Sequence, residues 1–90
     1  MIKIIYSGPY IKKEKKFIKK HPDLVSQYEK TIELLEINPY HPSLRLHKLT
    51  GKLSDLYSVS INITYRLSIE FLIKEDTIIP VEIGTHEEVY

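Results

Sequence analysis

The chain is short, nearly neutral and free of cysteine, which excludes several classes of protein. It has 90 residues, a net charge of +1 and 42% hydrophobic residues. Without cysteine, neither a disulfide framework nor a thiolate metal site can form. No apolar stretch approaches the roughly 20 residues of a membrane span, and the N-terminal residues become charged too early for a signal peptide. We therefore expect one small cytoplasmic domain, residues 1–90, with no metal, cofactor or membrane contact.

Charge is distributed unevenly along the chain. Residues 1–52 carry eleven Lys and Arg against five Asp and Glu, a net of +6. Residues 53–90 carry two against seven, a net of −5. This asymmetry indicates one face suited to a polyanion and another that repels it. For the lysines between positions 12 and 20 taken alone, a solvated helix surface is the better explanation.

The N-terminal part predicts a strand followed by a helix. Residues 2–6 are mostly apolar, as in a short strand. Ser7 or Gly8 is expected to cap a helix, with proline tolerated in its first turn. The helix should run to about Lys20, because its apolar residues recur on one stripe until the His-Pro-Asp sequence at 21–23 interrupts it.

A second helix is predicted to form a hairpin with the first. Apolar residues recur at three- and four-residue steps from about Asp23 onward. Asn38 should close this helix in a left-handed cap, because Pro39 cannot continue it. Residues 39–53 are expected to form a loop.

The clearest pattern is strict alternation between residues 57 and 73. Every odd-numbered residue in this range is apolar or aromatic, and the even-numbered residues from 58 to 70 are polar. Such alternation predicts a sheet with one buried and one solvent-exposed face. Because the pattern is too long for one strand, a hairpin is expected near residues 62–64. Unbroken parity requires an odd loop, which pairs Ile61 with Tyr65.

A last strand is expected from Thr77 to Ile83, with Pro80 marking a sheet edge or a bulge. No further secondary structure is expected beyond it. The order is then strand, helix, helix and three strands. This order predicts an α+β fold in which an N-terminal strand and a helical hairpin pack on one face of a mainly antiparallel sheet of about four strands.

The solvent-exposed face of the predicted sheet carries one cation, Arg66. The residues expected to point outward are Ser58, Ser60, Arg66, Ser68 and Glu70. A planar, permanently charged guanidinium suits an anion. An ion pair of Arg66 with Glu70 or Glu82 is the simpler alternative, and both remain open at this point.

Two other segments carry groups that can transfer protons, and both are expected to border the same face. The loop before the second strand contains His47, and the last residues contain His86 and Tyr90. Groups of these types can deprotonate the 2′-hydroxyl of RNA and protonate the leaving oxygen, while an arginine stabilises the charge on phosphorus. The other two histidines, His21 and His41, are predicted to be ordinary surface residues.

Four sequence segments together resemble a known family. They are Leu46-His47-Lys48-Leu49-Thr50-Gly51-Lys52-Leu53, Tyr57 to Asn62, Tyr65-Arg66-Leu67, and Ile83-Gly84-Thr85-His86-Glu87-Glu88-Val89-Tyr90. In order and spacing these segments resemble the RelE/ParE superfamily of toxins, and most closely its YafQ-like branch. The resemblance implies a RelE-like domain that cuts messenger RNA, typically on the ribosome, and is neutralised by a co-expressed antitoxin.

The resemblance also assigns roles to residues. The catalytic groups would be His47, Arg66, His86 and Tyr90, acting without metal. Contacts to RNA would come from Arg45, Lys48 and Lys52, and we group Ser60 with them. The alternatives are a ParE-like inhibitor of DNA gyrase and an inactive remnant that only binds its antitoxin. The antitoxin is expected to cover the basic helix or an exposed strand edge with a flexible helical segment.

Overall fold

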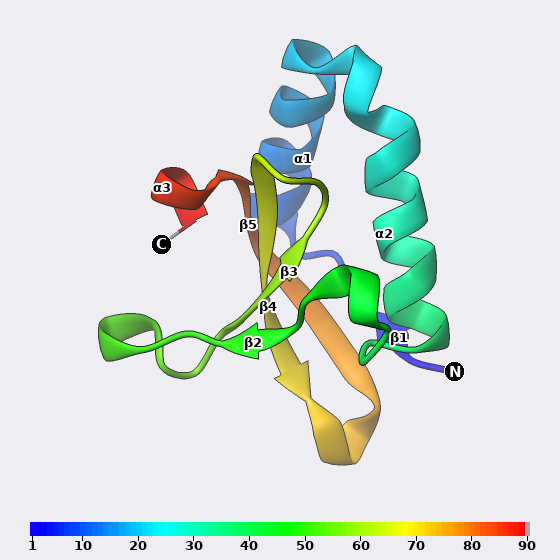
Figure 1. The fold of residues 1–90 in the computed structure, drawn as a ribbon, viewed down its shortest axis with the longest axis vertical. Coiled ribbons are helices and arrows are strands. Elements are labelled where there is room, and N and C mark those ends of the chain that lie inside the picture. Colours follow the sequence, from blue (N-terminus) through cyan, green and yellow to red (C-terminus); the bar gives the residue numbers. More distant parts are fainter. Residues whose placement is uncertain (90) are drawn as a thin grey trace.

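A helical hairpin packs against a twisted five-stranded sheet, and a short third helix lies at the far side of that sheet (Figure 1). The computed structural model describes residues 1–89. The strands are β1 (Lys3–Ile4), β2 (His47–Lys48), β3 (Tyr57–Ser60), β4 (Tyr65–Leu72) and β5 (Thr77–Thr85). The helices are α1 (Gly8–Lys20), α2 (Val25–Ile37) and α3 (His86–Val89). Every helix in this part of the chain is too short or too polar to cross a bilayer.

The sheet order is β1-β5-β4-β3-β2, with β1 parallel to β5 and all other neighbours antiparallel. This arrangement confirms the predicted α+β fold. It has one strand more than expected, because β2 lies within the loop predicted for residues 39–53. Two exposed residues, His47 and Lys48, form β2, and so short a strand leaves no alternating pattern in the sequence.

The first helix begins and ends where its sequence predicts. The Ser7 hydroxyl accepts a hydrogen bond of 3.3 Å from the backbone N–H of Tyr10, which satisfies one unpaired donor of the first turn. At the other end, the N–H of His21 donates to the carbonyl of Phe17. Proline at position 22 then starts a short 3₁₀ turn, Pro22–Leu24, that leads into α2.

The end of α2 differs from the prediction. Asn38 adopts an extended conformation, with φ of −159°, and is not in the left-handed region. The cause is the following Pro39, whose ring clashes with helical conformations of the preceding residue. Asn38 ends the helix with its side chain instead, because its Oδ1 accepts a hydrogen bond of 3.0 Å from the N–H of Tyr40.

The register of the β3–β4 hairpin confirms the parity argument. Ser60 lies opposite Arg66, and Val59 lies opposite Leu67. Continuing the same register, the N–H of Ile61 donates to the carbonyl of Tyr65 at 2.9 Å, which leaves a three-residue loop. A slip of one residue would turn the polar set toward the core, so the burial pattern and the loop length specify the same pairing.

The predicted irregularity at Pro80 is a β-bulge. Ser68 pairs with Glu82 but the next residue, Ile69, pairs with Pro80, so Val81 is the extra residue of β5. Beside it, β1 pairs only with Thr77 and Ile78. Proline, which has no N–H to donate, therefore lies beyond the end of the parallel ladder.

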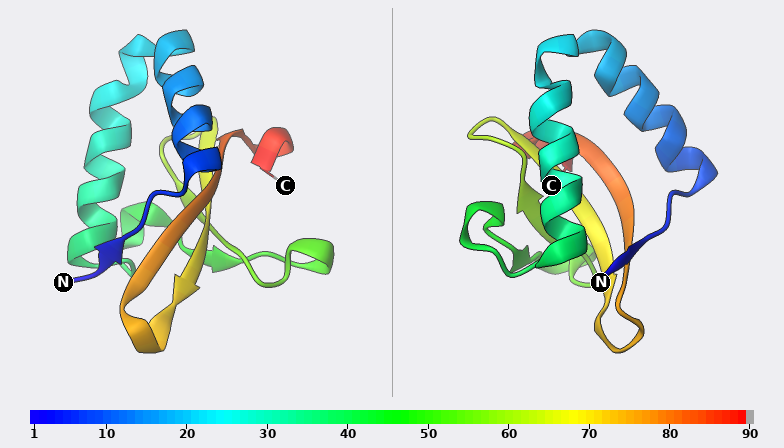
Figure 2. Two further views of the ribbon diagram at one scale, coloured as in Figure 1. Left: turned by 180° about the vertical axis from the view of Figure 1, so that it is seen from behind. Right: turned by 90° about the vertical axis from the view of Figure 1, so that its right-hand side faces the viewer.

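The core lies between the hairpin and the odd-numbered face of the sheet (Figure 2). From the helices it contains Tyr10, Phe17, Tyr28, Ile32 and Leu35. From the sheet it contains Val59, Leu67, Ile69, Phe71, Ile78 and Ile83. Because this layer covers one face, the opposite face is left for α3 and the loop around β2.

Candidate functional site

Polar residues form a row across the sheet on the face opposite the hairpin. His47 lies opposite Ser58, Ser58 opposite Ser68, and Ser68 opposite Glu82. Directly opposed residues of antiparallel strands point to the same side. The row therefore runs from the edge strand β2 to β5, across four of the five strands.

Arg66 lies in the next row of the same face, between Ser60 and Gly84. Arg66 is two strands from His47, about 10 Å across the sheet, and is displaced from it by two residues, about 7 Å along the strands. The side chain is half-buried, and its buried Nε has no hydrogen-bond partner within the described residues. The buried Ser68 hydroxyl likewise lacks a partner there. Such groups are uncommon in folded proteins.

The prediction that this face is fully solvent-exposed is wrong at its centre. Ser58 is 0% and Ser68 1% exposed. Two apolar side chains outside the main core, Leu49 and Val89, are buried as well. Strand alternation places Leu49 on the side of His47, and Val89 belongs to α3. The loop and α3 thus cover the middle of this face and leave its rim open.

The loop before β2 holds His47 through a local turn. Arg45 has a left-handed backbone, with φ of 50°, which is uncommon for a residue with a side chain. The turn brings the Arg45 carbonyl within 3.1 Å of His47 Nδ1. Because a carbonyl only accepts, Nδ1 is the donor in this contact.

The C-terminal segment forms helix α3, which corrects the prediction that no secondary structure follows the last strand. Thr85 and Glu88 hold it in a reciprocal capping box. The Thr85 N–H donates to Glu88 Oε1 at 2.9 Å, and the Glu88 N–H donates to Thr85 Oγ1 at 3.4 Å. These bonds lower the pKa of Glu88 from its usual 4.5, and the bond from the backbone N–H of Thr85 has the larger effect. The Thr-x-x-Glu sequence was the signal for this helix.

Gly84 allows α3 to fold back onto the sheet. A Cβ built on Gly84 would lie 3.0 Å from Glu88 Cβ, closer than normal contacts allow. Gly84 is also opposite Arg66 in the register. The helix therefore lies over the Arg66 face, and His86 is exposed at its first turn.

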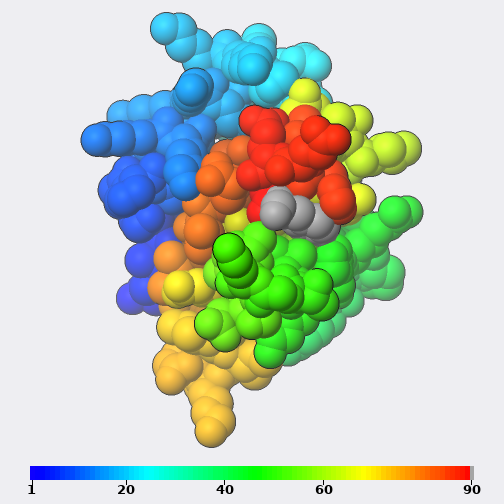
Figure 3. Space-filling view, turned by 90° about the vertical axis from the view of Figure 1, so that its left-hand side faces the viewer, coloured from blue at the N-terminus to red at the C-terminus, as the bar shows by residue number. Residues whose placement is uncertain are grey.

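The loop and α3 lie side by side on the molecular surface, as the space-filling view shows for residues near 50 and near 87 (Figure 3). Figure 1 places both on the same side of the sheet. Three predicted site segments, containing His47, Arg66 and His86, thus border one face. The predicted site residue Tyr90 lies outside the described residues.

The remaining predicted RNA contacts are more scattered. Arg45 and Lys52 are exposed on the loop around β2, Lys52 within the 3₁₀ turn Gly51–Leu53. Lys48 follows His47 in β2, so strand alternation directs it to the opposite side of the sheet. Ser60 donates its hydroxyl to the Asn62 carbonyl at 2.8 Å within the hairpin turn.

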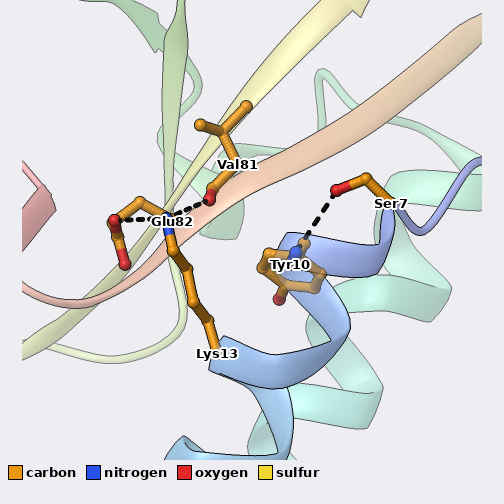
Figure 4. A network of polar contacts seen from close by, with 5 residues as sticks. All are labelled: Ser7, Tyr10, Lys13, Val81 and Glu82. Atoms are coloured by element: carbon orange, nitrogen blue, oxygen red, sulfur yellow. Dashed lines mark hydrogen bonds and ion pairs between the residues drawn. The ribbon is translucent and has the colours of Figure 1, made fainter.

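Two of the glutamates near this face are engaged by other residues. Glu82 forms an ion pair of 2.8 Å with Lys13 of α1, whose ammonium also donates a hydrogen bond to the Val81 carbonyl (Figure 4). Glu88 is held in the capping box. Within residues 1–89 no ion pair joins Arg66 to Glu70 or Glu82, so the predicted simple pairing of Arg66 does not occur there.

His21 is not the ordinary surface residue that its position beside a proline indicated. Its ring is half-buried, with its centroid 4.8 Å from those of both Phe17 and Tyr65. Only the fold brings Tyr65 to the end of α1. His41 is exposed as predicted, and its Nδ1 accepts a hydrogen bond from the Ser43 N–H.

Comparison with solved structures identifies the fold. YafQ from E. coli strain BL21(DE3) superimposes with a TM-score of 0.77 at 21% identity, over 97% of this chain and 96% of that one. A metal-bound toxin from Helicobacter pylori gives 0.78 at 26% identity, covering 100% of both chains. The chain has the RelE/ParE toxin fold. A YoeB/ParE toxin from Agrobacterium tumefaciens shares this fold at 13% identity, with a TM-score of 0.72 over 94% of this chain and 99% of that one.

The RelE/ParE fold is recognised here by structure, since no family model and no curated protein matches the sequence. The YafQ-like branch expected from the loop and tail motifs is the one to which several similar structures belong. Among the described residues, no three histidine or acidic side chains are grouped to hold a metal ion.

Proposed function

We propose that this chain is the toxin of a type II toxin–antitoxin pair and cleaves messenger RNA bound to the ribosome, without a metal ion. The observation that carries the proposal is the half-buried side chain of Arg66, which forms no ion pair within residues 1–89. It lies between the histidine of the loop and the histidine of α3. A guanidinium placed in this way suits a phosphodiester group.

The proposed reaction uses the substrate's own 2′-hydroxyl as the nucleophile. One histidine removes its proton as the oxygen attacks the neighbouring phosphorus, and the other protonates the departing 5′-oxygen. His47 suits the base, because the contact of its Nδ1 with the Arg45 carbonyl orients the ring. His86 suits the acid, and Arg66 stabilises the phosphorane charge. The resemblance adds Tyr90 as a fourth group and Arg45 and Lys52 as RNA contacts. Lys48, which the resemblance also implies, lies on the other side of the sheet, and the hydroxyl of Ser60 is used in the hairpin turn.

The proposed partner is an antitoxin. Two similar structures are complexes of this kind, the E. coli DinJ–YafQ toxin–antitoxin complex and the YoeB–YefM complex from Staphylococcus aureus. The two superpositions cover 99% and 96% of this chain, at 23% and 20% identity respectively. The ion pair of Glu82 with Lys13 and the hydrogen bond of Glu88 with Thr85 also support an RNA-binding face, because they reduce the repulsion of phosphate by these carboxylates.

The test is cleavage of a defined messenger, free and on ribosomes, by the purified chain. Replacing Arg66 or His86 with alanine should slow cleavage by about 100-fold or more, since each removes a group that acts on the transition state. His41→Ala, at an exposed histidine, is the matched control and should cleave normally. Activity should survive EDTA. Equal cleavage by wild type, R66A and H86A would refute the assignment.

One observation favours the gyrase alternative. Strand β3, Tyr57–Ser60, contains no lysine, arginine or histidine, so it offers RNA no cation beside Arg66. Inhibition of DNA supercoiling by the chain, with no cut in messenger RNA, would establish this alternative. Tight antitoxin binding with neither activity would indicate the inactive remnant.

A further inference from the structure

A groove of about 400 Å³ lies between α1 and α2, away from the proposed RNA site. The two helices are close at their connection and diverge toward their other ends (Figure 2). The walls and floor are apolar or aromatic and consist of Ile18, Tyr28 and Ile32. Between the helices, the Tyr10 hydroxyl bonds to that of Tyr28 at 2.7 Å, and Tyr28 donates to Glu14. This bridge fixes the separation of the helices.

The rim of the groove is acidic. Glu14 comes from α1, and Glu29 and Glu33 come from α2, one turn apart. Lysine, arginine and histidine are absent from its described lining. Tyr6 closes one end, and burial together with the charges of Glu14 and Glu36 raises its pKa. The groove therefore repels phosphate and suits a cation.

An exposed apolar patch continues the groove at the foot of α2. A smaller hollow of about 180 Å³ shares Glu33 with the groove and is also lined by Met1, Glu36 and Ile37. Met1 is 96% and Ile37 70% exposed. Large apolar side chains gathered beside a groove indicate a surface for a protein partner more than isolated ones do.

We propose that this groove, with the patch at its foot, binds a cationic amphipathic helix of a partner protein. The apolar face of that helix would lie on Ile18 and Ile32, and its lysines or arginines would meet Glu29 and Glu33. The basic α1 of a second copy does not fit, because its apolar face, including Phe17, is buried in its own core.

The probe is a synthetic Leu/Lys amphipathic helix of about 16 residues, roughly 24 Å long. Its binding is followed by chemical shifts of the chain. The expected result is saturable binding with the largest shifts at Ile18, Ile32 and Tyr6. A peptide with every lysine replaced by glutamate should not bind. Shifts centred elsewhere, or equal binding of both peptides, would overturn the proposal.

Charge reversal distinguishes binding of the peptide in the groove from its general electrostatic attraction to acidic residues. Glu29→Lys with Glu33→Lys should weaken binding about ten-fold or more. The matched control, Glu70→Lys with Glu75→Lys, makes the same charge change at exposed residues of the β4–β5 hairpin and should bind nearly as the wild type does. Equal weakening by both pairs would refute a specific site. A wild-type dimer that only the first pair dissociates would identify a second copy as the occupant and also refute it.

Discussion

The two flanks of α1 present opposite surfaces. On one flank, Glu14 and Ile18 line the acidic groove shared with α2. On the other, Lys13, Lys16 and Lys20 line a cleft of about 340 Å³ against β5 and α3. The buried Tyr10 and Phe17 lie on the stripe between these flanks.

The difference shows how one amphipathic helix can divide a small protein into two binding regions. The basic cleft adjoins α3 and the proposed RNA site through Gly84 and Glu88. The described lining of the acidic groove shares no residue with that cleft. The groove does not follow the uneven charge of the sequence, because its three glutamates, Glu14, Glu29 and Glu33, all belong to the basic half, residues 1–52.

The largest expected effect on stability comes from truncating Phe17, the buried residue of α1 between its two flanks. Phe17 is 7% exposed, and its ring packs against His21, Tyr28 and Tyr65. Phe17→Ala should lower the free energy of unfolding by about 3–5 kcal/mol, through lost burial and the cavity left behind. Chemical denaturation measures this.

Ile37→Ala is the control for this change, because it removes an apolar side chain that is 70% exposed. Its effect should stay within about 0.5 kcal/mol. If the two variants lose equal stability, α1 does not join the two regions as described.

A smaller effect is expected on the groove side, at the tyrosine bridge. Tyr28→Phe leaves the buried Tyr10 hydroxyl without its partner and should cost about 1–3 kcal/mol. Burial raises the pKa of Tyr10 and Tyr28 well above the usual 10.0. The unfolded chain therefore loses these protons first, and stability should fall as the pH rises above about 10.

Denaturation at a series of alkaline pH values tests the bridge. Tyr28→Phe should lose less stability between neutral and alkaline pH than the wild type, because one buried phenol is gone. Tyr40→Phe, at a tyrosine that is 62% exposed, should follow the wild type. Identical alkaline profiles for all three proteins would show that the bridge does not stabilise the hairpin.

The smallest effect on stability is expected on the cleft side, at the capping box. Glu88→Ala should weaken α3 by about 1 kcal/mol and reduce RNA cleavage, with little change in global unfolding. Because the pKa of Glu88 is lowered in the folded chain, this stabilisation is present above the usual 4.5. It should be lost as the pH falls through the folded value.

Amide exchange within α3 measures this local change. Glu87→Ala is the control, since Glu87 is exposed and outside the capping box. Glu88→Gln keeps an oxygen that accepts from Thr85 and should restore most of the protection. Protection of α3 that is unaffected by Glu88→Ala would show that the box does not hold the helix.

The site illustrates why some positions were predictable and others were not. Arg66 was found from the sequence because strict alternation gave its face and parity gave its register. Helix α3 was not predicted although Thr85 and Glu88 carried its signal, because a helix of four residues shows no helical periodicity. The role of His21 had no local signal at all, since its partner Tyr65 is 44 positions away in the chain.

The sequence by itself determined the helices α1 and α2, the register of the β3–β4 hairpin and an irregularity at Pro80. These depend on local sterics and on periodicity, which one stretch of chain contains in full. Only the tertiary structure decided that β2 pairs beside Ser58, that Ser58 and Ser68 are buried, and that α1 separates a basic cleft from an acidic groove. Such features depend on contacts between distant segments. These contacts form, and contribute to stability, only when the helices and the sheet pack together.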